Sequence, residues 1–217
     1  LEDPTTNNGD AVSTIDSTGI AVVDRQNTNG TWKFSTNGSS FSNLNVSDSN
    51  SRLLDGSNAN HKIKFVPNSN FNGTANITFR TWDRSTGTPG GTFDTRSNGG
   101  VTAFGGSTST ASITVTAVND KPTLDALSNQ TVNEDVAGNV GSFADADEGG
   151  GSDEDSQTFT FNVTQTSTNN GSLFSTAPAI ASNGTLSFTL ATDQFGTASF
   201  TVTAQDNGGG DNTSDAR

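Results

Sequence analysis

The residues of this chain whose chemistry stands out are oxygen-bearing side chains at the ends of predicted strands. Asn119 and Asp120 close one alternating strand, Asp145 and Asp147 follow another, and Asp206 follows a third. Carboxylates brought close together repel each other, and some must take up protons unless a cation neutralises them. Ca²⁺ binds roughly 6–8 oxygen ligands, so these residue types suit it better than zinc or copper, which favour softer ligands.

The order of the strands predicts that these residues meet. In a sandwich of antiparallel strands, successive loops alternate between the two ends. The strand after Asn119–Asp120 runs to the far end, the next returns to Asp145 and Asp147, and a later one returns to Asp206. We expect Glu2, Asp3 and the loop 68–70 to lie at the far end of the first copy. We therefore expect five or more oxygen side chains to gather where the two copies join.

Each of these residues also has an ordinary structural interpretation. A single aspartate at the end of a strand is more often a turn former or a solvated charge than a ligand. Convergence of three loops and a linker is the stronger indication. The acidic run Asp153–Asp155 follows three glycines, and we predict that it is a solvated loop.

The elements that must position these residues come from an internal repeat. The segment Gly73–Asp83 and the segment Gly196–Asp206 share Gly, Thr, Ala, Thr and Asp in step, with apolar residues at the same alternate positions. Glu2–Asp3 is likewise echoed by Glu134–Asp135. The repeat predicts two domains, residues 1–119 and residues 120–217.

Period-two alternation of apolar and polar residues predicts an all-β fold of two tandem antiparallel immunoglobulin- or cadherin-like β-sandwiches, with no amphipathic helix. In the strand Ala111–Val118 the alternate apolar residues are expected to point inward. They are Ala111, Ile113, Val115 and Ala117. The predicted strands are Ala11–Ile15, Ile20–Val23, Thr31–Ser35, Lys62–Val66, Ala75–Trp82, Ala111–Val118, Val140–Phe143, Thr158–Thr164, Leu186–Leu190 and Ser199–Ala204.

Both copies are expected to have an open edge. The first copy begins at Glu2–Asp3 without the leading strand that 122–132 gives the second copy. The second copy reaches Arg217 within what should be its last hairpin. An unpaired strand edge is a liability, so we expect a neighbouring domain or chain to cover it.

Composition narrows the class of protein. The 217 residues carry a formal net charge of −13 and contain no cysteine. This charge repels nucleic acid and anionic membranes, and the lack of cysteine excludes disulfides and thiolate metal sites. The sequence contains no apolar run long enough to predict a membrane-spanning helix. The expected partners are neighbouring repeats of the same protein, with a cell-surface protein or glycan as a further candidate.

Catalysis is not expected, and the alternative function is carbohydrate binding. His61 is the one histidine, and it lies in a polar stretch without a plausible catalytic partner. In the strand Ala75–Trp82 the alternation places Trp82 on the outer face, where an exposed indole could stack on a sugar. The competing interpretation is that the glycine-rich segment 84–108 folds over Trp82.

The stretches "ITVTAVNDKP", "NQTVNEDVAGNVGSFADADE" and "FVPNSNFNGTANITFRTWD" resemble the tandem cadherin-like repeats of large bacterial surface and secreted adhesins. The resemblance spans nearly the whole chain. It implies extracellular spacer or adhesion repeats that Ca²⁺ stiffens at each joint. The short loop after Ile15 departs from the pattern, so the resemblance does not extend to a metal at the outer end of the first copy. The metal ligands that the resemblance implies are Glu2, Asn119, Asp120, Asp145, Asp147 and Asp206.

Overall fold

The computed structural model describes residues 18–217, so the predicted ligand Glu2 and the predicted strand Ala11–Ile15 lie outside the described residues. The chain divides into two compact units, Leu1–Thr116 (unit 1) and Ala117–Arg217 (unit 2). All strand pairs in the described part are antiparallel, and its only helix is a single 3₁₀ turn, Asp48–Asn50. Each unit is an immunoglobulin-like β-sandwich, as the alternation predicts.

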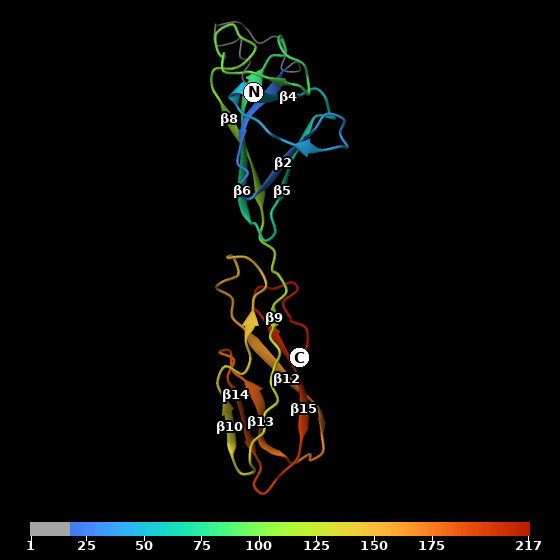
Figure 1. Cartoon of the computed structure of the whole chain (residues 1–217), viewed down its shortest axis with the longest axis vertical. Coiled ribbons are helices and arrows are strands. Elements are labelled where there is room, and N and C mark those ends of the chain that lie inside the picture. The colour runs from blue at the N-terminus through green and yellow to red at the C-terminus, as the bar shows by residue number, and fades with distance from the viewer. Residues whose placement is uncertain (1–17) are drawn as a thin grey trace. The chain divides into compact units, whose positions relative to one another are not determined.

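Unit 1 is built from two sheets (Figure 1). The larger sheet has the order β7-β4-β1-β6-β8 and the smaller has the order β3-β2-β5. Their strands are β1 (Gly19–Arg25), β2 (Gly30–Ser35), β3 (Ser42–Asn43), β4 (Ser51–Asp55), β5 (Lys62–Pro67), β6 (Gly73–Trp82), β7 (Thr92–Phe93) and β8 (Ser109–Val115).

The larger sheet of unit 1 is covered on both faces. One face packs against the smaller sheet through a cluster that includes Val22, Trp32, Leu54 and Phe65. A second cluster contains Ala21, Leu53, Trp82, Ala103 and Phe104. Alternate residues of β1 and β4 enter different clusters because successive side chains of a strand point to opposite faces.

The predicted inward stripe of β8 lies on the core face of its sheet, because Ile113 pairs with Ala75 and Ala111 with Ile77, but most of it is not buried. Ile113 is 41% exposed, Ala111 and Ala117 are also exposed, and only Val115 packs in part against the core. β8 lies at the edge of its sheet and pairs only with β6. An edge strand has one neighbour, so its side chains receive less cover than the alternation alone suggests.

Unit 2 has one three-stranded sheet, β10-β14-β13, and two pairs, β12-β15 and β9-β11. Its buried cluster includes Leu124, Leu186, Phe188 and Val202. The strands are β9 (Thr123–Leu124), β10 (Ala137–Val140), β11 (Ala146–Asp147), β12 (Thr160–Thr168), β13 (Phe174–Ile180), β14 (Leu186–Leu190) and β15 (Ala198–Gln205).

Two predicted elements of unit 2 differ in the structure. The expected leading strand over 122–132 is reduced to β9, which pairs only with β11. The strand expected at Val140–Phe143 lies earlier, as β10, and Val140 is its last residue. Ser142 has a positive φ of 51°, a conformation in which a non-glycine residue does not continue a strand.

The repeated segments occupy equivalent places in the two units. β6 pairs with β1 on one side in unit 1, and β15 pairs with β12 in unit 2. The strand before each, β5 or β14, pairs with β2 or β13 in the other sheet. The structure of one unit therefore serves as a reference for the other.

Candidate functional site at the linker end of unit 2

Three chain segments meet where the linker enters unit 2: residues 117–122, the loop 148–158 and the loop 206–212. In Figure 1 both loops lie at the end of unit 2 from which β9 starts. Hydrogen bonds join them, since Gln157 Nε2 donates to Asn119 Oδ1 at 2.8 Å and Thr158 N donates to Asn207 Oδ1 at 3.0 Å. The described part of the site lies within unit 2.

Glu154 is the centre of this arrangement. Its side chain is only 3% exposed. Its Oε1 accepts a hydrogen bond from the main-chain N–H of Asp120 at 2.7 Å, whereas Oε2 is buried without a hydrogen-bond partner. The prediction that residues 153–155 form a solvated loop is therefore wrong for Glu154, although Asp153 and Asp155 are exposed.

Asp206 is the second buried carboxylate, with 4% exposure. Its Oδ1 accepts from the N–H of Gly208 at 2.8 Å, and its Oδ2 lies 3.5 Å from the Nδ2 of Asn119. Asn119 Nδ2 also donates to the main-chain carbonyl of Asp211 at 3.3 Å. The side chain of Asn119 thus connects the linker to both loops.

Close packing around the site depends on two glycines. A Cβ at Gly150 would overlap the carboxylate of Glu154, and a Cβ at Gly208 would overlap the amide of Asn119. Neither glycine has a positive φ. Space, and not backbone conformation, therefore excludes a larger residue at both positions.

No basic side chain of the described residues neutralises the two buried carboxylates. The ion pairs recorded among residues 18–217 join Arg80 to Asp48, Arg84 to Asp55, Arg96 to Asp94 and Lys121 to Asp215. Lys121 is the basic residue of the linker, but it is paired with Asp215, whose Oδ1 lies 2.6 Å from its Nζ. Hydrogen bonding to Asp215, together with its charge, raises the pKa of Lys121, and the same contact lowers the pKa of Asp215.

The oxygen donors at this end suit a hard cation. Two buried carboxylates, the amide oxygens of Asn119 and Gln157 and nearby main-chain carbonyls supply oxygen ligands alone. Two of these oxygens, Glu154 Oε2 and Gln157 Oε1, are buried and without partners. Residues 18–217 contain no group of three or more acidic or histidine side chains placed to hold a metal. Amide and main-chain oxygens would therefore have to complete the shell.

The predicted ligands divide into those that the structure brings together and those that it does not. Asn119 contacts Asp206, and Asp120 contacts Glu154 through its main chain. Asp147 lies beside the linker, because it pairs with Thr123, but its Oδ1 accepts from Gly149 N. Asp145 is exposed and contributes only its carbonyl, to Asp125 N. Within the described residues, neither carboxylate has a recorded contact with Glu154 or Asp206.

Sequence reasoning missed Glu154 and Gln157. Glu154 stands between two exposed aspartates, and its composition is that of a solvated acidic run. The one feature of the sequence that points to these two residues is their place in the loop before an alternating strand. That strand is predicted to begin at Thr158 and begins at Thr160 in the structure. Residues in that position belong to a loop that enters the core, but the sequence does not say which of them turns inward.

The exposed tryptophan needed for sugar stacking is absent. Trp82 has 0% exposure, and its Nε1 donates to the carbonyl of Thr86 at 2.7 Å. Trp82 does lie on the outer face of its sheet, as the alternation predicts, but its indole is not exposed to solvent. Ala103 and Phe104 of the segment 84–108 cover it, which is the competing interpretation given above.

Comparison with known proteins identifies the type of module. Residues 119–217 match the family model of the bacterial Ig domain. No curated protein and no solved structure matches the chain. No helix among residues 18–217 has the length and apolarity needed to cross a membrane. Bacterial Ig domains are usual in extracellular and surface proteins, where they are typically structural or adhesive modules. By sequence and by fold, unit 2 is similar to the bacterial Ig domain.

Proposed function

We propose that this chain is a pair of extracellular spacer repeats of a large bacterial surface or secreted protein, and that Ca²⁺ stiffens the linker end of unit 2. The observation that carries the proposal is the burial of Glu154 and Asp206 with no basic partner among the described residues. A buried charge without a counter-charge costs several kcal/mol, in the range of about 3–5 when its partner is removed. A bound cation would supply the missing charge.

The cation would act on the linker through Glu154. This side chain holds the N–H of Asp120 with one oxygen and leaves the other oxygen available. Neutralising the carboxylate favours its buried, ordered position, and this position holds the linker against unit 2. Less freedom in residues 119–122 means fewer relative orientations of the two units. Pro122 restricts only its own φ and the preceding residue.

The ligands proposed for the cation are Glu154 and Asp206, completed by oxygens of Asn119, Gln157 and Asp120. Asp145, Asp147 and Glu2 stay predictions from the resemblance. Extracellular calcium modules typically bind with dissociation constants of about 10⁻⁴–10⁻³ M. Such affinities are met by calcium outside the cell and not by calcium in the cytosol.

The experiment compares the intact chain in millimolar Ca²⁺, in Mg²⁺ and in chelator. We expect chelation to lower the melting temperature of unit 2 and to broaden the distribution of lengths in small-angle scattering. Mg²⁺ should substitute poorly, because it requires a near-octahedral shell and retains its water.

Two variants distinguish the proposed ligand sets. Asp206→Asn should abolish both responses to calcium. The double variant Asp145→Asn, Asp147→Asn should abolish them only if the ligand set implied by the resemblance is correct. A chain whose melting and scattering are the same in calcium and chelator, and which takes up no calcium in calorimetry, would refute the proposal.

A further inference from the structure

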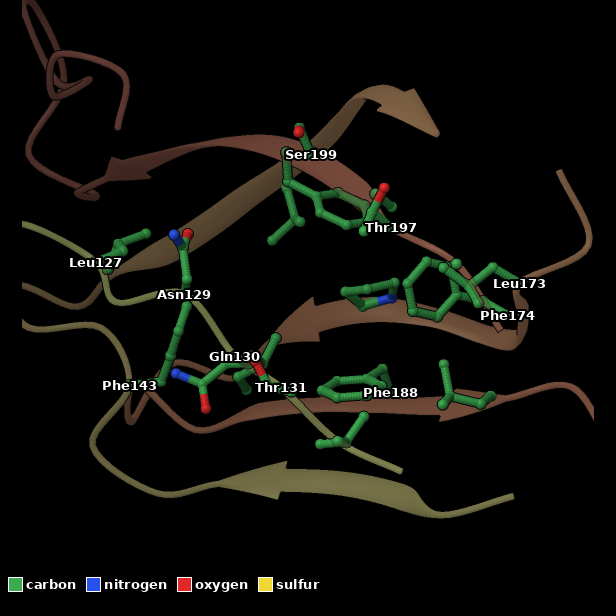
Figure 2. A pocket seen from close by; sticks show the side chains of 18 of the residues that line it. Leu127, Asn129, Gln130, Thr131, Phe143, Leu173, Phe174, Phe188, Thr197 and Ser199 are labelled. Carbon is green, nitrogen blue, oxygen red and sulfur yellow. The ribbon is translucent and has the colours of Figure 1, made fainter. Parts of the chain in front are cut away.

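A small polar cavity of unit 1 lies between the turn that joins β1 to β2 and the segment that follows β3. Its volume is about 210 Å³. A larger cavity in unit 2 has apolar rings such as Phe174 and Phe188 in its lining (Figure 2). The cavity of unit 1 is lined mainly by polar side chains instead. Its lining includes Arg25, Asn27, Thr31, Trp32 and Asn43.

The indole of Trp32 leaves a hydrogen-bond donor without a partner at this cavity. Trp32 is 5% exposed and packs in the core, where its ring centre lies 5.1 Å from that of Phe65. Its Nε1 is buried and has no hydrogen-bond partner among residues 18–217. An indole N–H can only donate, and a buried donor without a partner costs free energy. An acceptor on a ligand in the cavity would remove that cost.

The other polar groups of the lining also have hydrogen-bonding capacity to spare. Arg25 makes two recorded hydrogen bonds, at 3.4 Å to the carbonyl of Val46 and at 3.2 Å to Oδ1 of Asn45. Its guanidinium has further N–H donors in a planar fork that matches a carboxylate. Among residues 18–217, the side chains of Asn27 and Asn43 have no recorded hydrogen bond. No carboxylate is part of the lining, so these donors favour an anionic ligand.

Lysines extend the positive charge across the outer face of the smaller sheet. Three of the four lysines of the chain, Lys33, Lys62 and Lys64, lie on β2 and β5, and none forms an ion pair among residues 18–217. Lys33 is directly opposite Lys64, an arrangement in which like charges repel. Strands β2, β3 and β5 contain no acidic residue. In a chain of net charge −13, this concentration of positive charge indicates an anionic partner.

The cavity and the lysines form one continuous surface. Thr31 lines the cavity and stands two residues before Lys33, so both side chains lie on the same face of β2. Asn43 also lines the cavity, and it pairs with Lys33. Val66, opposite Thr31, adds an apolar group that is 40% exposed. The surface therefore combines cations, amides, a hydroxyl and exposed apolar carbon.

We propose that this surface of unit 1 binds an anionic polysaccharide, with the carboxylate of one acidic sugar residue in the cavity. The carboxylate would accept from Nε1 of Trp32 and from the guanidinium of Arg25. The three lysines would bind carboxylates of neighbouring sugar residues. A sugar ring also offers hydroxyls to the asparagines and a C–H face to Val66, which an acidic peptide side chain does not offer. This binding needs no calcium and does not depend on the site in unit 2.

The first test follows the two indole N–H signals of the isotope-labelled intact chain by NMR, since Trp32 and Trp82 are its two tryptophans. A galacturonate tetramer is added in chelator, so that calcium plays no part. We expect the Trp32 signal to shift saturably. The Trp82 signal should stay, because its Nε1 already donates to the carbonyl of Thr86 at 2.7 Å. A Trp32 signal that does not move would overturn the proposal.

Matched ligands identify the chemistry that the surface selects. A neutral galactose tetramer lacks the carboxylates, and a glutamate tetramer carries them on a peptide. Both should bind more weakly than the galacturonate tetramer by about tenfold or more, because the first lacks charge-assisted hydrogen bonds and the second lacks the sugar ring. Equal binding of the neutral tetramer would refute the role of charge. Equal binding of the glutamate tetramer, or an equal shift in acetate, would refute the assignment to a polysaccharide.

Variants separate the contributions of the cavity and of the sheet face. Arg25→Gln and Trp32→Phe change the cavity, and the double variant Lys33→Gln, Lys64→Gln changes the sheet face. Each should weaken binding of the galacturonate tetramer by about tenfold or more in calorimetry, since each removes donors to carboxylates. Circular dichroism establishes that each variant is folded, and the Arg25 and lysine variants keep the test decisive if Trp32→Phe does not fold.

The matched control is Arg96→Gln, which removes an exposed charge of unit 1 that is paired with Asp94 and does not line the cavity. This variant should bind the galacturonate tetramer as the unchanged chain does. If it weakens binding as much as the double lysine variant, only the net charge of the chain matters and the proposal is wrong.

Discussion

Replacing Glu154 by glutamine should have opposite effects on the stability of unit 2 with and without calcium. The change keeps the shape of the side chain and one oxygen that can accept the N–H of Asp120. It removes the charge of a side chain that is 3% exposed and whose Oε2 has no partner. Charge is therefore the main property that differs between the two proteins.

In chelator, we expect the variant to be at least as stable as the unchanged chain. An unsatisfied buried polar group costs about 1–3 kcal/mol, and more if it is charged. Glutamine leaves a neutral group there, so the gain should be about 1 kcal/mol. In calcium at a hundredfold excess over the dissociation constant, the unchanged chain gains about 2.7 kcal/mol from binding. The variant should gain almost none of this.

Urea unfolding in the two conditions measures both effects. Circular dichroism follows both units, whereas tryptophan fluorescence follows unit 1 alone, because Trp32 and Trp82 are the two tryptophans of the chain. The fluorescence transition is thus an internal control that should not respond to the change.

The matched control is Asp153→Asn, which removes an exposed charge from the same loop. Surface substitutions of this kind usually change stability by less than about 0.5 kcal/mol. If calcium stabilises the Glu154→Gln chain as much as the unchanged chain, the reasoning is refuted. Equal responses of the Glu154 and Asp153 variants would show that only the net charge of the loop matters.

Three further predictions concern other parts of the chain. Trp82→Ala should destabilise unit 1 by about 3–5 kcal/mol, measured by urea unfolding with Trp32 fluorescence. Trp82→Phe should cost less because it keeps part of the packing. Equal losses of stability in the two variants would contradict the packing argument. Gly208→Ala should weaken calcium binding in calorimetry, because a Cβ there overlaps the Asn119 amide, whereas Gly209→Ala, with no atom near its Cβ but a φ of 87°, should lower stability with little loss of affinity. Hydrogen bonds from Arg96 lower the pKa of the Asp94 carboxylate to about 2, so its charge is lost only as pH falls through that value; Arg96→Ala should return the pKa toward its ordinary range in an NMR titration, and an unchanged titration would exclude this contact in solution.

The strands that were predicted best are those with clean alternation and a partner on each side. Leu186–Leu190 has the predicted bounds, and the predicted Ala75–Trp82 lies within β6. β13 was missed because Ser175–Pro178 shows little alternation of apolar and polar residues. It forms because β14 pairs with it, with shifts in register. Pairing between strands, and not local pattern, decides such elements.

Of the predicted ligands, the structure brings the side chains of Asn119 and Asp206 together, and the metal site itself stays a prediction. Loop alternation indicates the linker end, and the structure brings Asn119 to Asp206 there. The sequence pattern could not identify Glu154 as buried. Its inward turn between two exposed aspartates depends on the packing of the loop against Asp120 and Gly150. Trp82 shows the same limit, since its cover comes from Ala103 and Phe104, about twenty residues later in the chain.

The central claim is that a cation holds the linker to unit 2 through Glu154, and the amide proton of Asp120 reports this contact directly. Its N–H donates to Glu154 Oε1 at 2.7 Å. Hydrogen exchange of this amide, measured by NMR in calcium and in chelator, should show strong protection in calcium and exchange at least tenfold faster in chelator. The Glu154→Gln chain should exchange at one rate in both conditions. Equal protection of Asp120 in calcium and in chelator, in the unchanged chain, would contradict the claim.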